Sequence, residues 1–255
     1  MRKPRYNLIS TVGISLLNNI RREVEPVLEG FVREARWRDL GQYLADRDPR
    51  DRILGAEIYS LAQLVKTKDV KPSGLWFMMS DTEDAKTTEE VLKGFSSKAS
   101  WPKIKLSDIH FVHVEGLQDT NPGQFRSKGL RNLVREMARI ISEQGRESLA
   151  IDATGGYKAQ VALAVALGQA MSIPVFYRHE RFAYIIELPP MPITLDYRVL
   201  GRNAWLLQRL ENNETLTSAE IGSVEDKVRV LLQSMRIDGQ TLWELSPVGL
   251  IYLEG

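Results

Sequence analysis

The sequence predicts an α/β protein: a Rossmann-like, mostly parallel sheet with helices on both faces, followed by a small C-terminal domain. Short apolar runs rich in β-branched and aromatic residues alternate with helix-length amphipathic segments, which is typical of parallel sheets. Two of these runs break into small and hydroxyl residues just before a helical pattern, as at the carboxyl ends of strands that bind ligands. The alternation stops at Pro189–Pro192, where the small domain is expected to begin.

Six segments are expected to be strands because each is a short apolar run bounded by turn residues. Strands buried on both faces of a parallel sheet have such nearly continuous apolar sequences. The last of the six is expected to run antiparallel to its neighbour. The strands are Tyr6–Ser10, Leu75–Met79, Ile109–Val114, Ser148–Asp152, Pro174–Tyr177 and Ala183–Leu188.

Helices are expected between these strands, where apolar residues recur at helical spacing. The segment Glu115–Ser127, which contains Gly and an Asn-Pro-Gly sequence, is instead expected to be a long loop. The helices are Ser15–Glu29, Arg33–Ala45, Pro49–Lys66, Thr87–Phe95, Lys128–Glu143 and Tyr157–Met171.

The predicted domains are residues 1–190 and 191–255. In the second, Asn203–Leu210, Ser218–Gly222 and Glu225–Met235 have short helical patterns. Gly239–Leu253 then alternates like a small hairpin. Three helices and a hairpin predict a winged-helix-like domain.

The composition of the chain excludes several kinds of protein and of functional site. A charged fraction of 26% with a formal net charge of +1 argues against a protein that coats nucleic acid. The absence of cysteine excludes disulfides, thiolate catalysis and cysteine-ligated metals. The first apolar run is too short for a signal peptide or a membrane span, so a cytoplasmic protein is expected. No cofactor is predicted. No metal site is predicted either, since His110 and His113 lie three apart in a strand, point to opposite faces and cannot bind one metal ion together.

The first break, Ser10-Thr-Val-Gly-Ile-Ser15, offers hydroxyl groups and main-chain N–H groups at the start of a helix. Anions are favoured at such a position. The alternative is that Ser15 only caps the helix while Gly13 makes the turn. The segment contains neither a Walker loop nor a dinucleotide-binding fingerprint.

The second break, Asp152-Ala-Thr-Gly-Gly-Tyr-Lys158, is more specific. Gly155 and Gly156 would let a ligand approach the main chain closely. Lys158 would lie in the first turn of a helix, where the helix dipole disfavours a cation that has no anionic partner. It could therefore bind a phosphate, although a solvated lysine or a pair with Asp152 would also fit.

Arg126, Lys128, Arg131 and Arg135 form a basic run at the junction between the long loop and its helix. Such a run can be a solvated helix face. Its position after the third strand also puts it near the edge of the sheet where the two breaks are expected.

Taken together, the two breaks resemble the CRISPR-associated Rossmann-fold (CARF) domains. Members commonly open with a sequence like Thr-Thr-Val-Gly-Thr-Ser-Leu-Leu, which Ser10-Thr-Val-Gly-Ile-Ser-Leu-Leu17 matches here. They also carry a motif like Asn-Ala-Thr-Gly-Gly-Tyr-Lys after a later strand, which Asp152-Ala-Thr-Gly-Gly-Tyr-Lys-Ala159 matches. The resemblance covers Tyr6–Leu188. The departures are Ser10, Ile14 and Asp152, of which Asp152 adds a carboxylate near the site.

The resemblance implies a homodimer that binds a cyclic oligoadenylate such as cyclic tetra-adenylate, the messenger of type III CRISPR antiviral defence. It also implies a stand-alone ring nuclease, which cleaves the messenger without a metal to linear products with 2′,3′-cyclic phosphate ends. The HEPN ribonuclease motif of other members is absent, since the last histidine is His179. The expected catalytic residues are Lys158, Ser15 and Thr11, and the expected ligand-binding residues are Ser10, Gly13, Thr154, Gly155, Gly156 and Arg126.

The C-terminal domain bears on the alternative, a non-catalytic sensor that regulates transcription or binds a protein partner. From Asp196 to Gly255 the chain has six basic and nine acidic residues, a net charge of −3. Helices that read DNA normally present lysine and arginine to the phosphates. DNA binding is therefore disfavoured, and a dimerising or lid role is expected for this domain.

Overall fold

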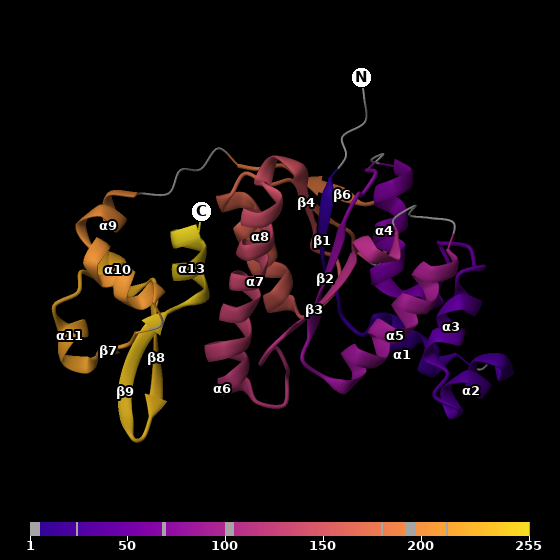
Figure 1. The fold of residues 1–255 in the computed structure, drawn as a ribbon, viewed down its shortest axis with the longest axis horizontal. Coiled ribbons are helices and arrows are strands. Elements are labelled where there is room, and N and C mark those ends of the chain that lie inside the picture. Colours follow the sequence, from indigo (N-terminus) through magenta and orange to yellow (C-terminus); the bar gives the residue numbers. More distant parts are fainter. Residues whose placement is uncertain are drawn as a thin grey trace.

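The structure, a computed structural model, describes residues 6–23, 25–67, 70–99, 105–179, 181–191, 197–212 and 214–254. Its centre is a six-stranded sheet of order β3-β2-β1-β4-β5-β6 (Figure 1). The first five strands in sequence pair in parallel, and β6 runs antiparallel to β5, as predicted. The strands are β1 (Asn7–Thr11), β2 (Leu75–Ser80), β3 (Ile109–Val114), β4 (Leu149–Asp152), β5 (Val175–Tyr177) and β6 (Ile186–Leu188).

Helices cover both faces of this sheet, so the predicted α/β fold is confirmed (Figure 1). One face carries α7 and α8, and the other carries α1 to α5. The helices of this part are α1 (Ser15–Arg22), α2 (Pro26–Arg33), α3 (Trp37–Leu44), α4 (Gly55–Thr67), α5 (Glu83–Lys98), α6 (Pro122–Gln124), α7 (Leu130–Gln144) and α8 (Lys158–Ala170), with short turns η1 (Arg52–Leu54), η2 (Leu106–Asp108), η3 (Phe125–Gly129) and η4 (Arg146–Ser148).

The core lies on the two faces of the central strands. Successive residues of a strand point to opposite faces. Ile9 accordingly packs with the helices α7 and α8, while Leu8 packs with the helices on the other side. All six residues of β2 are buried, because both its faces are covered and both its edges are paired.

The order of the strands indicates where a ligand is expected to bind. The chain runs outward from β1 to β2 and β3, and then returns to the other side of β1 as β4 and β5. The direction of winding therefore reverses between β1 and β4. In open α/β sheets, ligands bind beyond the carboxyl ends of the strands at such a switch point. The first predicted break lies at the end of β1, and the second lies at the end of β4.

Two predicted elements are wrong in the first part of the chain, and others differ in their bounds: α5 begins at Glu83 and not at Thr87, and β6 begins at Ile186 and not at Ala183. The expected helix Ser15–Glu29 is two helices, because α2 begins at Pro26, whose missing N–H and fixed φ suit the first position of a helix. The expected loop Glu115–Ser127 also contains helical structure. The Asn121 side chain accepts a hydrogen bond from the Gln124 N–H at 3.0 Å and so caps α6, which leads through the π-helical turn η3 into α7.

The C-terminal part has the order two helices, one strand, two short helices and a two-stranded hairpin, followed by a last helix. Its small sheet has the order β7-β9-β8. This order agrees with the winged-helix-like expectation, which stays a prediction. The elements are α9 (Tyr197–Arg202), α10 (Ala204–Glu211), β7 (Leu216–Thr217), α11 (Ser218–Gly222), α12 (Asp226–Arg229), β8 (Leu232–Ile237), β9 (Gln240–Leu245) and α13 (Pro247–Glu254).

The hairpin begins earlier than predicted. The expected third helix, Glu225–Met235, is only the short α12 and then becomes β8. Asp238 and Gly239 make the turn with φ values of 49° and 79°, a geometry that suits an Asp-Gly pair. The expected hairpin Gly239–Leu253 therefore holds only the second strand, and its remainder is α13.

The C-terminal part packs against the main sheet's helices and continues their core. Leu250 and Ile251 of α13 belong to the same buried cluster as Leu133 of α7 and Leu167 of α8. The predicted boundary at residue 190 stays a prediction, and residues 192–196 lie outside the described part. No helix of the described residues is long and apolar enough to cross a membrane.

Candidate functional site

The two breaks, about 140 residues apart in the sequence, touch one another at the carboxyl edge of the sheet. The Thr11 hydroxyl donates a hydrogen bond to the Gly155 carbonyl at 2.6 Å and lies 3.4 Å from the Asp152 carbonyl. A Cβ on Gly13 would lie 2.8 Å from the Gly156 nitrogen, and one on Gly155 would lie 2.8 Å from the Thr11 carbonyl oxygen. The glycines are therefore required first by the packing of one break on the other.

Glu57 of α4 already occupies the N-terminus of α1. Its carboxylate accepts hydrogen bonds from the N–H groups of Gly13, Ser15 and Leu16 at 3.2, 3.3 and 3.2 Å. It also accepts one from the Ser15 hydroxyl at 2.6 Å. Glu57 is only 1% exposed, so a buried anion already satisfies the helix terminus that was expected to bind a phosphate.

Ser15 is tied to α4 in both directions. Its hydroxyl donates to Glu57 and accepts from the Ala56 N–H at 2.8 Å. The first turns of α1 and α4 are thereby joined. Ser15 and Thr11, which were expected to contact the phosphate, have protein partners in this structure. Their direct contact with a ligand stays a prediction, and it would require an exchange of these hydrogen bonds.

Asp152, at the end of β4, is fully buried among hydroxyl groups. Its carboxylate accepts hydrogen bonds from Ser60 and Thr154, both at 2.6 Å, and a longer one from Ser10 at 3.5 Å. Burial raises the pKa of Asp152 to about 6, against the opposing effect of the three hydroxyl donors. The predicted ligand-binding residues Ser10 and Thr154 thus meet at this carboxylate.

Lys158 is the first residue of α8, and its side chain is exposed. No ion pair of Lys158 is found among the described residues, and the Asp152 carboxylate is engaged by hydroxyls instead. Gln160, two residues further on, is buried and anchors the helix start. Its side chain accepts from the Tyr157 N–H at 3.2 Å and donates to the Met78 carbonyl at 2.9 Å. Lys158 therefore projects from a fixed backbone.

The predicted ligand-binding residue Arg126 lies in η3, beside the C-terminal hairpin. Its guanidinium donates to the Ser234 carbonyl at 3.3 Å. With Arg236 it lines a cavity of about 470 Å³ between η3 and the hairpin. Its neighbour Phe125 packs edge-on against Tyr157 of the second break, with ring centroids 5.3 Å apart. Arg126 thus connects the neighbourhood of the site to the C-terminal part, and a role in ligand binding stays a prediction.

Two more contacts hold the hairpin against this segment. Arg131 of α7 forms a buried ion pair with Glu244 of β9, in which the side chains are 10% and 7% exposed. The other carboxylate oxygen of Glu244 accepts from the Gln233 amide at 2.9 Å. The same amide lies 3.3 Å from the Ser127 carbonyl. Part of the predicted basic run therefore holds the two parts of the chain together.

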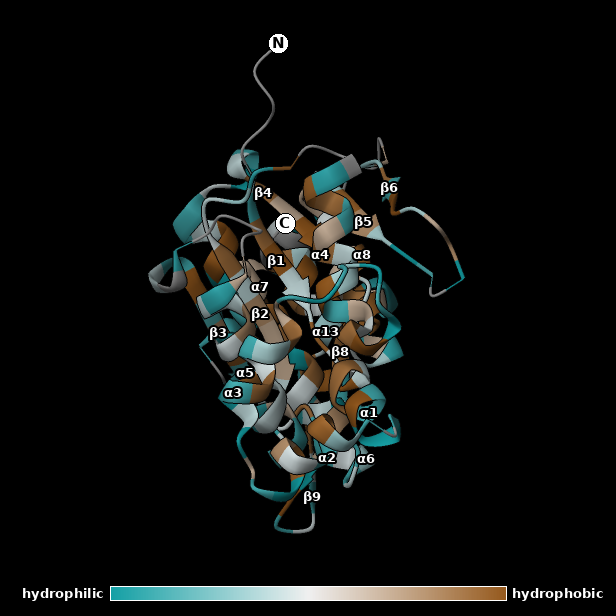
Figure 2. Ribbon diagram, turned by 90° about the vertical axis from the view of Figure 1, so that its right-hand side faces the viewer, coloured by the Kyte–Doolittle hydropathy of each residue, from teal (hydrophilic) through white to brown (hydrophobic). Residues whose placement is uncertain are grey.

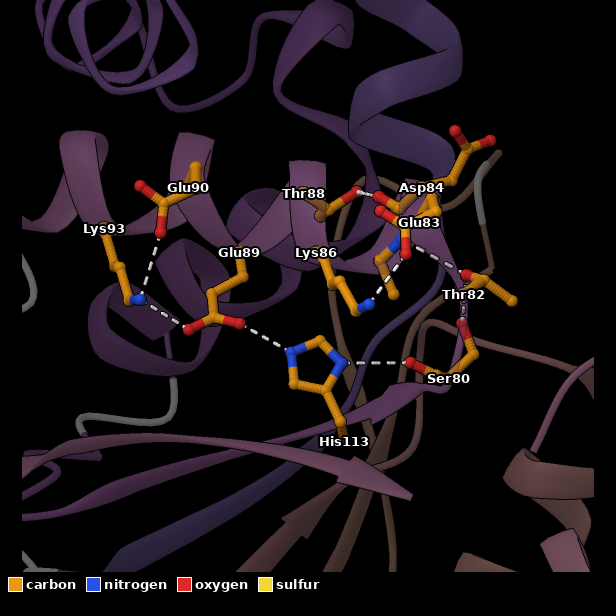
Figure 3. A network of polar contacts seen from close by, with 11 residues as sticks. Ser80, Thr82, Glu83, Asp84, Lys86, Thr88, Glu89, Glu90, Lys93 and His113 are labelled. Atoms are coloured by element: carbon orange, nitrogen blue, oxygen red, sulfur yellow. Dashed lines mark hydrogen bonds and ion pairs between the residues drawn. The ribbon is translucent and has the colours of Figure 1, made fainter. Parts of the chain in front are cut away.

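The two histidines of β3 lie on opposite faces, as predicted. His113 belongs to a polar network with α5 (Figure 3). Its Nδ1 donates to the Ser80 carbonyl at 3.1 Å, and its Nε2 lies 2.5 Å from a Glu89 oxygen. Burial raises the pKa of Glu89, but hydrogen bonds with Lys93 and His113 together bring it below its usual value. His110 instead stacks on Trp76, with ring centroids 4.9 Å apart.

Sequence reasoning missed four residues at this edge: Glu57, Ser60, Tyr59 and Arg178. The first three lie on α4, at helical positions that carry no motif. Arg178 follows β5. Its N–H donates to the Thr154 hydroxyl at 3.2 Å, and its guanidinium lies 3.7 Å from the centroid of the Tyr59 ring. The signal for Arg178 was its position one residue after a predicted strand of a parallel sheet.

Two comparisons with known proteins found a match. A family model described as CRISPR-associated protein (Cas_APE2256) matches residues 52–191, more than half of the chain. This range includes Glu57 and the second break. Among solved structures, the chain is similar to Can2 from Sulfobacillus thermosulfidooxidans in complex with cyclic tetra-adenylate (cA4). The identity is 11% and the TM-score 0.36, and the match covers 98% of this chain but 61% of the Can2 chain. No curated protein matches the sequence.

Proposed function

The chain belongs to the family of CRISPR-associated proteins (Cas_APE2256), and on that premise we propose that it is a ring nuclease for cyclic tetra-adenylate. The observation that carries the proposal is the contact between the two CARF-like breaks. It lies at the switch point of the sheet, with the exposed Lys158 at its rim. An exposed cation in the first turn of α8, beside Gly155 and Gly156, suits a phosphate diester.

The proposed reaction is an internal transesterification. A ribose 2′-oxygen attacks the adjacent phosphorus, the bond from phosphorus to the 5′-oxygen breaks, and a 2′,3′-cyclic phosphate forms. The 2′-hydroxyl gives its proton to water, and the departing 5′-oxygen takes one from water. The protein has to hold the two reacting oxygens in line and stabilise the charge on the phosphorane.

Five residues of the site have a proposed part in this reaction. The ammonium group of Lys158 neutralises the non-bridging oxygens, and the main chain at Gly155 and Gly156 borders the phosphate. Thr11 and Ser15 hold the two breaks and α4 in register through their hydrogen bonds. Two copies of the chain would present two such sites to a ring of matching symmetry, so we propose a homodimer.

The test is a single-turnover incubation of the protein, in excess, with cyclic tetra-adenylate in EDTA. Cyclic hexa-adenylate is run in parallel to compare ring sizes. One cut leaves the mass unchanged and alters the retention time, while two cuts give dinucleotides with cyclic phosphate ends. We expect linear products to accumulate. Intact ligand after prolonged incubation would contradict the catalytic proposal.

A second candidate is a sensor that binds the messenger without cleaving it. The observation that favours it is the set of contacts from η3 and α7 to the hairpin, through Arg126, Ser127 and Arg131. They connect the neighbourhood of Tyr157 to the C-terminal part. This candidate predicts tight binding, no product, and changed hydrogen exchange in β8 and β9 on ligand addition. Salt-dependent binding to duplex DNA would favour a transcriptional role, despite the acidic C-terminal part.

A further inference from the structure

The chain between β5 and β6 forms a loop beyond the carboxyl edge of the sheet. Tyr177, the last residue of β5, pairs with Ile186, the first residue of β6. The described connecting residues, 178, 179 and 181–185, therefore lie beyond this one edge (Figure 2). The contact between the two breaks lies at the same edge. The loop is thus next to the proposed ligand site.

Arg178 fixes the near end of this loop to the site. Its N–H donates to the hydroxyl of Thr154, which precedes Lys158 by four residues. Its Nε donates to the Phe182 carbonyl at 3.2 Å, while its guanidinium lies over the ring of Tyr59. The shape of the loop is therefore set by contacts with the second break and with α4.

The described part of the loop carries a row of three aromatic rings. The centroids of His179 and Phe182 are 5.2 Å apart, and those of Phe182 and Tyr184 are 6.5 Å apart with an interplanar angle of 24°. Phe182 is 43% exposed and Tyr184 is 63% exposed, while the adjacent Ile185 is buried. Single exposed apolar side chains are common, but neighbouring exposed aromatic rings beside the proposed ligand site favour a role in binding.

We propose that this aromatic row, His179, Phe182 and Tyr184, stacks on adenine bases of the cyclic oligoadenylate while Lys158 contacts the phosphate. This inference rests on the proposed function. Adenine presents a flat π-face, and the stacking of a base on an aromatic side chain contributes about 1–3 kcal/mol per base. The second break would supply the contacts to phosphate. Its one aromatic ring, Tyr157, already packs on Phe125.

The test compares the affinity for cyclic tetra-adenylate among four proteins by isothermal titration calorimetry. They are the wild type, the double variant Phe182→Ala/Tyr184→Ala, the ring-preserving variant Phe182→Tyr, and Trp205→Ala. Trp205 is the matched control, since it is 58% exposed but lies on α10 in the C-terminal part.

We expect the double variant to bind cyclic tetra-adenylate at least about tenfold more weakly than the wild type. Phe182→Tyr and Trp205→Ala should bind like the wild type. Far-UV circular dichroism confirms that each protein is folded.

The outcomes separate this inference from the proposed function. If the wild type binds and the double variant binds equally well, the stacking inference is overturned while the proposed function stands. A double variant that loses self-association on size-exclusion chromatography, with unchanged affinity per site, would assign the row to a contact with a second copy and also overturn it. If the wild type binds neither cyclic tetra-adenylate nor cyclic hexa-adenylate, the proposed function is wrong and the inference falls with it.

Discussion

The Ser15 hydroxyl donates a 2.6 Å hydrogen bond to the buried carboxylate of Glu57, and the N–H groups of Gly13, Ser15 and Leu16 point at the same carboxylate. The sequence predicts that this helix terminus binds an external anion. In the structure the anion is internal and comes from α4. The first break is therefore held in place by α4 beside the proposed site, while the exposed cation, Lys158, belongs to the second break.

Glu57→Ala is expected to destabilise the fold. The substitution leaves three N–H groups and one hydroxyl without their acceptor, and each buried unsatisfied group costs about 1–3 kcal/mol. Because water can reach part of the opened space, we expect a loss of about 2–4 kcal/mol in the free energy of unfolding, measured by urea denaturation. Glu83→Ala is the control, since Glu83 lies in the first turn of α5 but its side chain is 86% exposed. Equal effects of the two substitutions would contradict the capping role.

Glu57→Gln tests how the same carboxylate affects the ligand. The substitution keeps an acceptor oxygen but removes a buried negative charge next to the Gly13–Gly156 contact. Since like charges repel strongly where water is excluded, the affinity for cyclic tetra-adenylate should rise several-fold. An unchanged affinity would mean that the phosphate lies away from the first break, and the expected ligand roles of Ser15 and Gly13 would then be wrong.

Because Asp152 is buried, we expect the free energy of unfolding to depend on pH. Its pKa is raised by burial to about 6, above the value of about 4 expected in the unfolded chain. The folded protein therefore holds this proton more tightly. The resulting stabilisation is fully present below about pH 4 and is lost as the pH rises through about 6, a difference of about 3 kcal/mol.

The measurement compares the wild type with Asp152→Asn by urea denaturation between pH 4 and pH 7.5. Asparagine cannot ionise, so the variant should lack this loss and gain stability relative to the wild type as the pH rises. Asp226→Asn, whose side chain is 97% exposed, is the control. Parallel pH profiles of the wild type and Asp152→Asn would show that burial does not hold the proton on Asp152.

Most of the main sheet could be predicted from the sequence, because its strands are buried on both faces and carry local apolar runs. β3 has the predicted bounds, and β1 differs by one residue at each end. The bounds of the C-terminal hairpin were predicted wrongly, because its first strand has no local signal. Residues 232–237 have no strong strand pattern and become a strand only by pairing with β9. The Asp238-Gly239 pair was the local signal that could have marked the turn.

The candidate site could be predicted only in part, because some of its residues depend on contacts between segments far apart in the sequence. Its two motifs lie in sequence at the ends of strands, and their meeting follows from the sheet topology. Glu57 and Ser60 lie in the middle of the chain on a helix, and nothing local distinguishes them from other polar residues. Their roles depend on how α4 packs against α1 and β4, which only the folded structure determines.

The buried pair Arg131–Glu244 should hold the C-terminal hairpin on α7. Glu244→Ala leaves the Arg131 guanidinium buried without its partner, which typically costs about 3–5 kcal/mol. Limited proteolysis should then cut the C-terminal part first. Arg139→Ala removes an exposed arginine from the same helix and should cost less than about 1 kcal/mol. Replacing both partners by Met and Leu should restore most of the stability. A stable Glu244→Ala protein would show that the pair does not hold the hairpin.

Lys158→Ala is the most direct test of the proposed chemistry. Lys158 is exposed, begins α8 and has no ion pair among the described residues, so its removal should leave the melting temperature nearly unchanged. If its ammonium group mainly meets the charge that develops on the phosphorane, single-turnover cleavage should fall by about 10²–10³-fold, as for the loss of one oxyanion donor. Binding should weaken less, because the contacts of the main chain and the bases remain.

Lys86→Ala, which removes another exposed lysine near the start of a helix, should leave cleavage intact. Unchanged cleavage in Lys158→Ala would make Lys158 a solvated residue and the site assignment wrong, whereas a collapse of the melting temperature would make it a structural one. Only the selective loss of cleavage supports its assignment to the phosphate.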